Sequence, residues 1–294
     1  MKLATFDDQG RDAVGLIRNE ALVPVADLLP DAPTTMIGLI EAGPTLLRAL
    51  ADMSSTDGNA LPLAGVTLLP PIPRPGKILC IGLNYVDHAA EGGTTVPDYP
   101  AVFMRTASSL VAPGAPVLRP RRSDRLDYEA ELTVVIGRRC HDVGEDEALD
   151  HVFGYTLFND VSVRDYQRKT TQWTMGKNFD GTGPMGPAIV TKDDLPAGAS
   201  GLGIRTRLNG QTVQDASTDQ MVFKVPRLVS LISQVMTLEP GDVIATGTPS
   251  GVAHARKPPL WMKPGDRIEV EVDGIGTLGN PVADAAGSRL TDAA

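Results

Sequence analysis

Two glutamates one residue apart form the first pattern in the chain that could carry chemistry. In the stretch DYEAELTVVIG (127–137), apolar and polar residues alternate as they do in a half-buried β-strand. Side chains of a strand repeat every two residues, so Glu129 and Glu131 leave the same face. Neighbouring like charges repel unless a cation lies between them, and a hard divalent ion that binds carboxylate oxygens fits that role. Taken alone, however, the pair is better explained as a solvated strand face.

A histidine and a glutamate three residues apart offer acid–base chemistry. In GLNYVDHAAE (82–91), His88 and Glu91 share a face if the segment is helical. A carboxylate bonded to an imidazole fixes its tautomer and raises its basicity, which prepares a base that can activate water. The alternative is an ordinary surface pair, but this one follows an apolar strand and opens a Gly- and Pro-rich stretch typical of a flap. The remaining histidines lie in polar contexts and receive no role: His141, His151 and His254.

A third carboxylate is available at the end of another apolar strand. Asp160 closes the run GYTLFND and could join the two glutamates. Three carboxylates with no Cys or His partner favour Mg²⁺ or Mn²⁺ over zinc. Two further candidates have ordinary alternatives, because Lys177 in WTMGKNFD could be a surface lysine and Thr248 in TGTP a turn residue.

The elements around these residues predict an α+β protein that is mainly β. Residues 1–70 combine short apolar runs with a helical pattern broken at Gly43-Pro44, and we interpret them as a small structural domain with an antiparallel sheet. The stretch PPIPRPG (70–76) holds too much proline for a helix or a central strand and reads as a linker. Many short strands with few helices then predict a catalytic domain over 71–285, followed by a tail at 286–294.

Composition narrows the classes of partner. The formal net charge of −9 argues against a nucleic-acid binder, which would show a basic face. No apolar run approaches the roughly 20 residues that span a bilayer, so no membrane is expected. The first ten residues turn acidic too soon for a signal peptide, and Cys80 and Cys140 are expected as free buried thiols. The predicted compartment is therefore the cytoplasm.

Two glycine-rich motifs invite other assignments and are rejected on context. GTGPMG (181–186) fits the letters of the dinucleotide fingerprint, but the prolines around it prevent the helix that this fingerprint must open. GTPSG (247–251) resembles a nucleophile elbow with its serine one place late, so a loop is expected there.

Five separated motifs, in this order and spacing, resemble the fumarylacetoacetate hydrolase family: GLNYVDHAAE, DYEAEL, GYTLFNDVSVRDYQ, GKNFDGTGPMGP and GDVIATGTPSGV. The match spans roughly residues 73–282 and is similar to the bacterial acylpyruvate hydrolases that carry a small extra N-terminal domain. The resemblance implies a mixed β-sandwich roll with a metal at its mouth, in a homodimer. The eukaryotic namesake has a further metal-binding Asp before the His, and this chain has Asn84-Tyr85 there instead, which puts the fumarylacetoacetate substrate in doubt.

The resemblance also implies a role for each candidate residue. It assigns Glu129, Glu131 and Asp160 to Mg²⁺ or Mn²⁺, and it makes His88 and Glu91 the water-activating pair on a lid. Lys177 becomes the partner of a developing enolate. The substrate site is lined by Arg105, which replaces the lysine of many relatives, and by Arg164, Gln167 and Thr248.

The function predicted at this point is metal-dependent hydrolysis of a C–C bond in a 2,4-dioxo acid, an acylpyruvate or close analogue, with release of pyruvate or a similar 2-oxo acid. The partner is thus a small anionic 2-oxo acid, chelated by the ion as Lewis acid and template. Decarboxylation of a 2-oxo dioic acid such as oxaloacetate, or isomerisation of an unsaturated 2-hydroxy acid, is the alternative in the same site. A binding member of the fold without catalysis is the alternative of another class.

Overall fold

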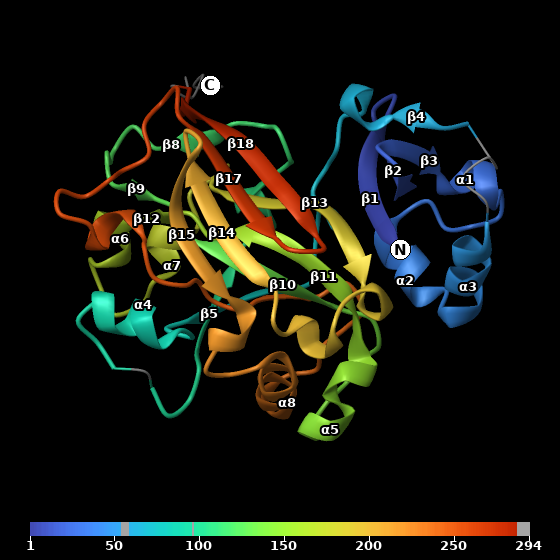
Figure 1. The fold of residues 1–294 in the computed structure, drawn as a ribbon. Coiled ribbons are helices and arrows are strands. Elements are labelled where there is room, and N and C mark those ends of the chain that lie inside the picture. The colour runs from blue at the N-terminus through green and yellow to red at the C-terminus, as the bar shows by residue number, and fades with distance from the viewer. Residues whose placement is uncertain (54–58, 96, 287–294) are drawn as a thin grey trace, which may run out of the picture.

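The computed structural model describes residues 1–53, 59–95 and 97–286, and it confirms a mainly β fold with few helices (Figure 1). Most of the predicted tail lies outside the described residues. The strands are β1 (Lys2–Asp8), β2 (Arg11–Arg18), β3 (Ala21–Pro24), β4 (Leu61–Pro62), β5 (Ile78–Gly82), β6 (Ala101–Arg105), β7 (Leu110–Val111), β8 (Val117–Arg119), β9 (Leu126–Asp127), β10 (Ala130–Ile136), β11 (Val152–Asn159), β12 (Ser162–Val163), β13 (Gly183–Thr191), β14 (Gly203–Leu208), β15 (Gln211–Ser217), β16 (Val243–Ala245), β17 (Arg267–Val272) and β18 (Gly276–Asp284).

The α-helices are short: α1 (Val25–Leu28), α2 (Met36–Glu41), α3 (Pro44–Asp52), α4 (Val86–Glu91), α5 (Glu145–Ala148), α6 (Arg164–Gln167), α7 (Thr174–Lys177) and α8 (Val225–Val235). Among the described residues, no helix is long and apolar enough to cross a membrane. The predicted helix break between α2 and α3 is confirmed, since Gly43 has a φ of +83° and Pro44 opens α3.

Two sheets carry the fold. The larger follows the order β4-β3-β2-β1-β13-β11-β10-β16-β5-β6, with β7 beside β13, and the smaller follows β15-β14-β17-β18-β8. One apolar cluster joins both sheets and α8, because it contains Leu132 of β10, Val270 of β17 and Leu228 of α8. This packing of one sheet on the other is the sandwich that the family resemblance implied.

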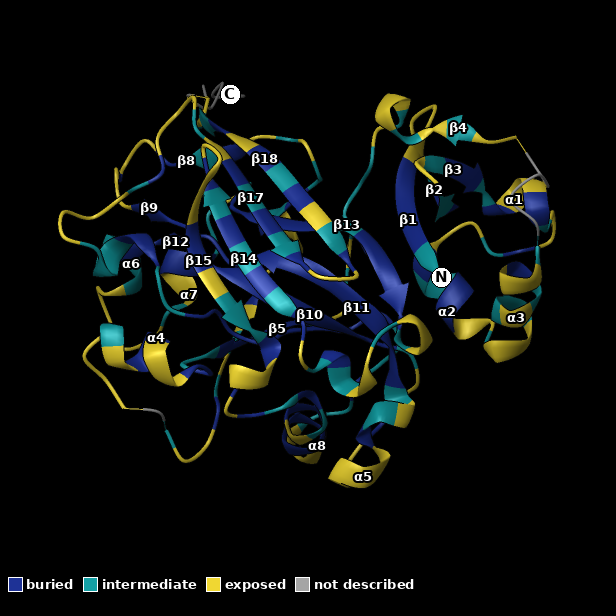
Figure 2. Ribbon diagram, viewed as in Figure 1, coloured by how far each residue is buried: buried dark blue, intermediate teal, exposed yellow. Residues whose placement is uncertain are grey.

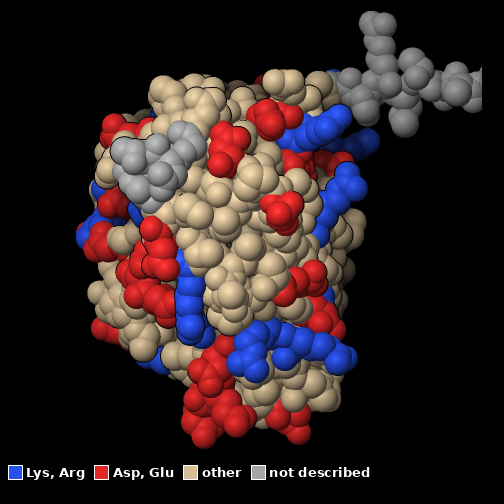
Figure 3. Space-filling model, turned by 90° about the vertical axis from the view of Figure 1, so that its right-hand side faces the viewer, with Lys and Arg blue, Asp and Glu red and all other residues tan. Residues whose placement is uncertain are grey.

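The N-terminal segment continues the large sheet instead of forming one of its own. Strand β1 pairs with β13 at Lys2↔Val190 and Leu3↔Ile189, so β1–β4 extend the sheet beyond β13. Met36 and Leu39 of α2 share an apolar cluster with Val135 of β10, and the same cluster contains Leu50 of α3. The N-terminal helices therefore cover the second face of the sheet. Figure 3 shows this side of the molecule, where acidic and basic side chains lie around a broad uncharged centre. The domain boundary at residue 70 stays a prediction.

The strand that carries Glu131 is more deeply buried than its alternation suggests. All seven residues of β10 are buried, and Figure 2 shows β10 and β11 buried along their length. The prediction of a half-buried strand is therefore wrong, because β10 is central and packs against the small sheet on one face and the N-terminal helices on the other. Its polar side chains cannot be a solvated face, which removes the ordinary explanation of the glutamate pair.

Candidate active site

Three carboxylates meet where β10 and β11 run antiparallel. The register pairs Ala130 with Asn159, so Glu129, just before β10, lies beside Asp160, just after β11. The Asp160 N–H donates to the Glu129 carbonyl at 2.9 Å and fixes this junction. Ligand oxygens of Glu129, Glu131 and Asp160 lie within 4.8 Å of one another, and all three residues are buried. We call them the carboxylate triad.

Lys177 and Arg164 hold two members of the triad. Lys177 Nζ, at the end of α7, donates to Glu129 Oε2 at 2.6 Å and to Asp160 Oδ2 at 2.5 Å. Arg164 Nη2 lies 2.6 Å from Glu129 Oε1. Burial alone would raise the pKa of Glu129, but Lys177 and Arg164 hold it below its ordinary value. The two helices that carry these cations pack closely, since a Cβ at Gly176 would lie 2.4 Å from the Gln167 backbone.

Glu131 has no such partner. Its Oε2 accepts one hydrogen bond, from the Gly247 N–H at 3.0 Å, and the described part of the chain offers it no ion pair. Gly247 reaches it because its φ is +95°, and a Cβ there would lie 2.9 Å from the Ile81 carbonyl oxygen. Burial, together with Asp160 and Glu129, raises the pKa of Glu131 well above its ordinary value. A buried carboxylate without a cation, next to two others, fits a divalent metal ion with oxygen ligands.

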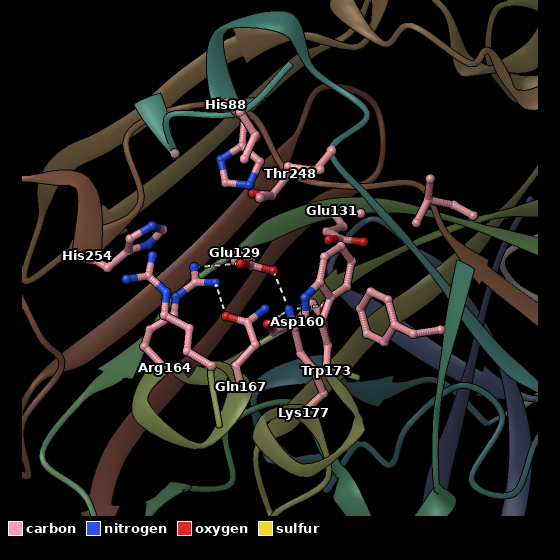
Figure 4. Close-up of a pocket in the computed structure, with 17 residues that line it drawn as sticks. His88, Glu129, Glu131, Asp160, Arg164, Gln167, Trp173, Lys177, Thr248 and His254 are labelled. Atoms are coloured by element: carbon pink, nitrogen blue, oxygen red, sulfur yellow. Dashed lines mark hydrogen bonds and ion pairs between the residues drawn. The ribbon is translucent and has the colours of Figure 1, made fainter. Parts of the chain in front are cut away.

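The predicted His88–Glu91 pair is present and borders the same pocket. His88 Nδ1 lies 2.9 Å from Glu91 Oε1 on α4, as the i,i+3 spacing predicts. The other oxygen of Glu91 accepts the Gly251 N–H at 2.8 Å, which ties α4 to the loop after β16. His88 lines the pocket together with the triad, and its Nε2, which has no partner within the described segments, is available to a bound molecule (Figure 4).

Gln167 and Thr248 also line the pocket, and each has a donor to spare. Gln167 Oε1 accepts from Arg164 Nη1 at 3.0 Å, and its amide N–H groups have no acceptor among the described residues. Thr248 Oγ1 accepts from Gln214 Nε2 at 2.9 Å, so its own O–H can donate into the pocket. Arg164 lines the pocket as well, but its guanidinium is taken by Asp127, Glu129 and Gln167.

The structure does not place Arg105 in the lining of the substrate site, where it was predicted. Its guanidinium is buried behind the triad, where Nη1 donates to Asp160 Oδ1 at 2.7 Å and Nη2 to Thr182 Oγ1 at 2.9 Å. The residues that line the pocket do not include it. A buried aspartate needs a cation, and the charge of Arg105 is used to pair with Asp160.

Sequence reasoning gave no role to His254, a polar residue of the pocket wall. His254 lines the pocket, and its Nδ1 lies 3.2 Å from Asp127 Oδ2. Burial alone would raise the pKa of Asp127, but Arg164 and the His254 hydrogen bond lower it. The position of His254, three residues after Gly251 in a motif loop, was the one available signal.

Two aromatic rings complete the other side of the pocket and were also missed. Trp173 and Phe103 line it, with their ring centroids 5.5 Å apart in an edge-to-face arrangement. Trp173 lies directly against Gly82 at the end of β5, where a Cβ would be 2.1 Å from the indole ring. These rings shield the triad from water, which strengthens every charge interaction within it.

A family model and a curated relative both match most of the chain. The model of the fumarylacetoacetate (FAA) hydrolase C-terminal region matches residues 77–283. A mitochondrial oxaloacetate tautomerase of Xenopus laevis is 45% identical over 255 residues, which is 86% of this chain and 80% of that protein.

Solved structures agree on the fold. A fumarylacetoacetate hydrolase from Exiguobacterium antarcticum superposes with a TM-score of 0.86 at 36% identity, covering 97% of this chain and 100% of the other. Maleylpyruvate hydrolase from Sphingobium sp. SYK-6, in complex with manganese(II) and pyruvate, has a TM-score of 0.81 at 30% identity, with the same coverage of both chains. The family match, the identities and the shared fold together show that this chain belongs to the fumarylacetoacetate hydrolase family.

Proposed function

We propose that the protein is a divalent-metal-dependent enzyme that interconverts the keto and enol forms of a 2-oxo dicarboxylic acid of the oxaloacetate type. The observation that carries the proposal is a buried carboxylate triad in one pocket with an imidazole that a carboxylate orients. The identity to an oxaloacetate tautomerase over most of both chains supports this substrate class.

Enolisation moves a proton between C3 and the 2-oxo oxygen, and the pocket has a group for each end. A divalent ion held by the triad would polarise the 2-oxo group and so make the C3 hydrogens more acidic. His88 takes the C3 proton at Nε2, because its Nδ1 is occupied by Glu91 at 2.9 Å. Glu91 keeps the imidazole in one orientation and one tautomer through its contact with Nδ1.

The oxygen that gains charge needs donors in a pocket that excludes water. Lys177 Nζ lies at the triad, where it donates to Glu129 Oε2, Asp160 Oδ2 and the Asp160 carbonyl, so it would stabilise that oxygen through its positive charge. The spare donors of Gln167 and Thr248 suit the carboxylate next to the 2-oxo group. These three residues therefore bind and orient the acid while His88 moves the proton.

The test follows the enol form of oxaloacetate by its ultraviolet absorbance. The protein with Mg²⁺ or Mn²⁺ should speed its loss well beyond the rate with metal alone. His88→Ala should lower this rate by roughly 10²- to 10⁴-fold, the usual contribution of a general base. Glu91→Gln should lower it less, since it spoils orientation but keeps the base. Ketonisation no faster than with free metal ion would overturn the proposal.

Hydrolysis of an acylpyruvate, the function predicted from the sequence, is the second candidate. The His88–Glu91 pair favours it, because the same imidazole could deprotonate a water that attacks the 4-carbonyl. The C3–C4 bond then breaks, the acyl group leaves as a carboxylic acid and the remainder as pyruvate. The manganese and pyruvate complex of maleylpyruvate hydrolase supports such a product in a related fold. Pyruvate release from a panel of acylpyruvates distinguishes the two candidates, and carbon dioxide release from oxaloacetate tests decarboxylation.

A further inference from the structure

One cation of the pocket, Arg168, has no partner in the part of the chain that the structure describes. Lys177 and Arg164 are both committed to the triad or to Asp127. Arg168 lines the same pocket, yet its side chain makes no hydrogen bond or ion pair within the described ranges. An arginine that faces a binding pocket with its N–H donors unused is suited to an anion.

The chain places Arg168 at the outer end of the pocket. It follows α6 directly, and its backbone N–H donates to the Arg164 carbonyl at 3.2 Å. Arg164 is buried and held by Asp127 and Glu129, so the turn that carries Arg168 has a fixed base. Arg168 itself is exposed, whereas Glu131 at the floor of the pocket is 1% exposed.

His254 adds a second nitrogen donor or acceptor to this part of the pocket. Its backbone N–H and its Nδ1 both contact Asp127 Oδ2, at 3.0 and 3.2 Å, which holds the ring and leaves Nε2 for a ligand. Figure 4 shows His254 on the side of Arg164, away from Glu131 and Lys177. The pocket therefore has an anionic metal end and a basic end.

We propose that Arg168, with His254, forms a subsite for the second carboxylate of a dicarboxylic 2-oxo acid. The inference rests on the proposed function, in which the first carboxylate and the 2-oxo group occupy the triad end. A second carboxylate at the other end of a short acid then points away from the triad and toward the basic end. Arg168 binds it through two N–H groups of one guanidinium, and this contact makes the enzyme select dicarboxylic over monocarboxylic 2-oxo acids.

The test compares two substrates that differ only at the far end, oxaloacetate and the monocarboxylic 2-oxobutanoate, with metal-dependent hydrogen exchange at C3 as the common readout. In Arg168→Gln, the ratio of kcat/KM for oxaloacetate to that for 2-oxobutanoate should fall about 10- to 100-fold, the value of a hydrogen bond to a charged group. The ratio for Arg168→Lys should lie between those of the wild type and Arg168→Gln, because lysine keeps the charge but cannot donate two parallel N–H groups. His254→Phe should lower the ratio in the same direction.

Lys169→Gln is the matched control. It removes the same charge one residue away, but Lys169 Nζ lies 3.6 Å from the Tyr166 ring centroid and does not line the pocket. The substrate ratio of this variant should equal that of the wild type. An equal fall in Lys169→Gln would show a general charge effect and overturn the subsite.

A binding measurement keeps this inference separate from the proposed function. Calorimetry with Mg²⁺ compares oxalate, which reaches only the metal end, with 3,3-difluoro-oxaloacetate, which lacks C3 hydrogens and cannot enolise. Arg168→Gln should weaken only the difluoro acid. If the wild type were inactive but Arg168→Gln still weakened binding of the difluoro acid, the tautomerase proposal would be overturned and the subsite retained. Equal binding of the difluoro acid by variant and wild type would overturn the subsite.

Discussion

Glu131 differs from the other triad members because it is buried without a cation, and this makes it the sharpest test of the metal site. Glu131→Gln keeps the shape of the side chain and the hydrogen bond from Gly247, but removes the charge. We expect the variant to bind Mn²⁺ at least about 10-fold more weakly, because a hard cation prefers a carboxylate to an amide oxygen. Manganese paramagnetic resonance measures this without reference to turnover.

The control for this variant is Glu147→Gln, which removes the same charge from an exposed residue of α5. Its manganese affinity should match that of the wild type. Unchanged affinity in Glu131→Gln would mean that the ion binds elsewhere. Removal of metal with a chelator should abolish ketonisation in the wild type, and added Mg²⁺ or Mn²⁺ should restore it.

The raised pKa of Glu131 also predicts how metal stabilisation changes with pH. Without metal, the folded chain holds a proton on Glu131 above pH 4.5, its ordinary pKa, where the unfolded chain has released it. This contribution to stability is therefore lost as the pH rises through the folded pKa. A divalent ion binds the deprotonated form, so the increase in Tm caused by Mg²⁺ should grow with pH in that window.

Calorimetric scans with and without Mg²⁺ across this pH range measure the effect. In Glu131→Gln the increase in Tm should be small and should not grow with pH in the same way, because the titrating group is gone. A metal-induced increase in Tm that is flat with pH in the wild type would contradict the raised pKa.

At the scale of elements, one buried amide connects the start of α4 to the sheet. Asn84, between β5 and α4, donates to the Phe223 and Thr246 carbonyls at 3.0 and 2.7 Å and accepts the Phe223 N–H at 2.7 Å. These contacts hold the Asn84 side chain within the fold, and Asn84 is not among the residues that line the pocket. Its hydrogen bonds position the turn that leads to His88.

Asn84→Ala should therefore destabilise the protein and misplace the base. An unpaired buried group costs about 1–3 kcal/mol, and the variant leaves three, so we expect a loss of about 3 kcal/mol once water has entered the space. Urea denaturation measures the free energy of unfolding. Asn59→Ala, at an exposed position, should change it by less than about 0.5 kcal/mol. Equal stability of both variants would show that the Asn84 contacts are dispensable.

The sequence predicted the elements and the local pairs well, because these depend on near neighbours. The two-residue repeat placed Glu129 and Glu131 on one face, and the i,i+3 spacing predicted the His88–Glu91 contact. The helix break at Gly43-Pro44 was equally local.

Contacts between distant segments could not be read in this way. The second covered face of β10 depends on helices about 90 residues earlier, and the His254–Asp127 contact joins residues 127 apart. The family resemblance assigned Arg105 to the substrate site, because the sequence gives its position in the chain but not the residue that it pairs with. Only the folded chain shows that Asp160, 55 residues later, takes its charge.

At the scale of the whole molecule, the edge strand β6 is the surface most in need of a partner. The large sheet ends at β6, whose outer edge has no neighbour in the described part of the chain. Its alternate residues Val102 and Met104 are 40% and 45% exposed, and Tyr99 just before it is 52% exposed. An exposed apolar edge strand is prone to pair with another chain. We therefore expect the homodimer implied by the family resemblance to cover β6.

This dimer matters for the site because the inward residues of β6 belong to it. Phe103 lines the pocket and Arg105 holds Asp160 Oδ1 at 2.7 Å, so a partner against the outer face of β6 would fix both.

Light scattering after gel filtration should give twice the chain mass of 31.1 kDa for the wild type. The double variant Val102→Lys, Met104→Lys should be a monomer, since lysines on an edge strand prevent pairing. Val235→Lys is the matched control, because Val235 is 68% exposed on α8 and is not part of the large sheet, and its variant should stay dimeric. A double variant that keeps the wild-type mass would place the dimer interface elsewhere, and a monomeric wild type would remove the dimer altogether.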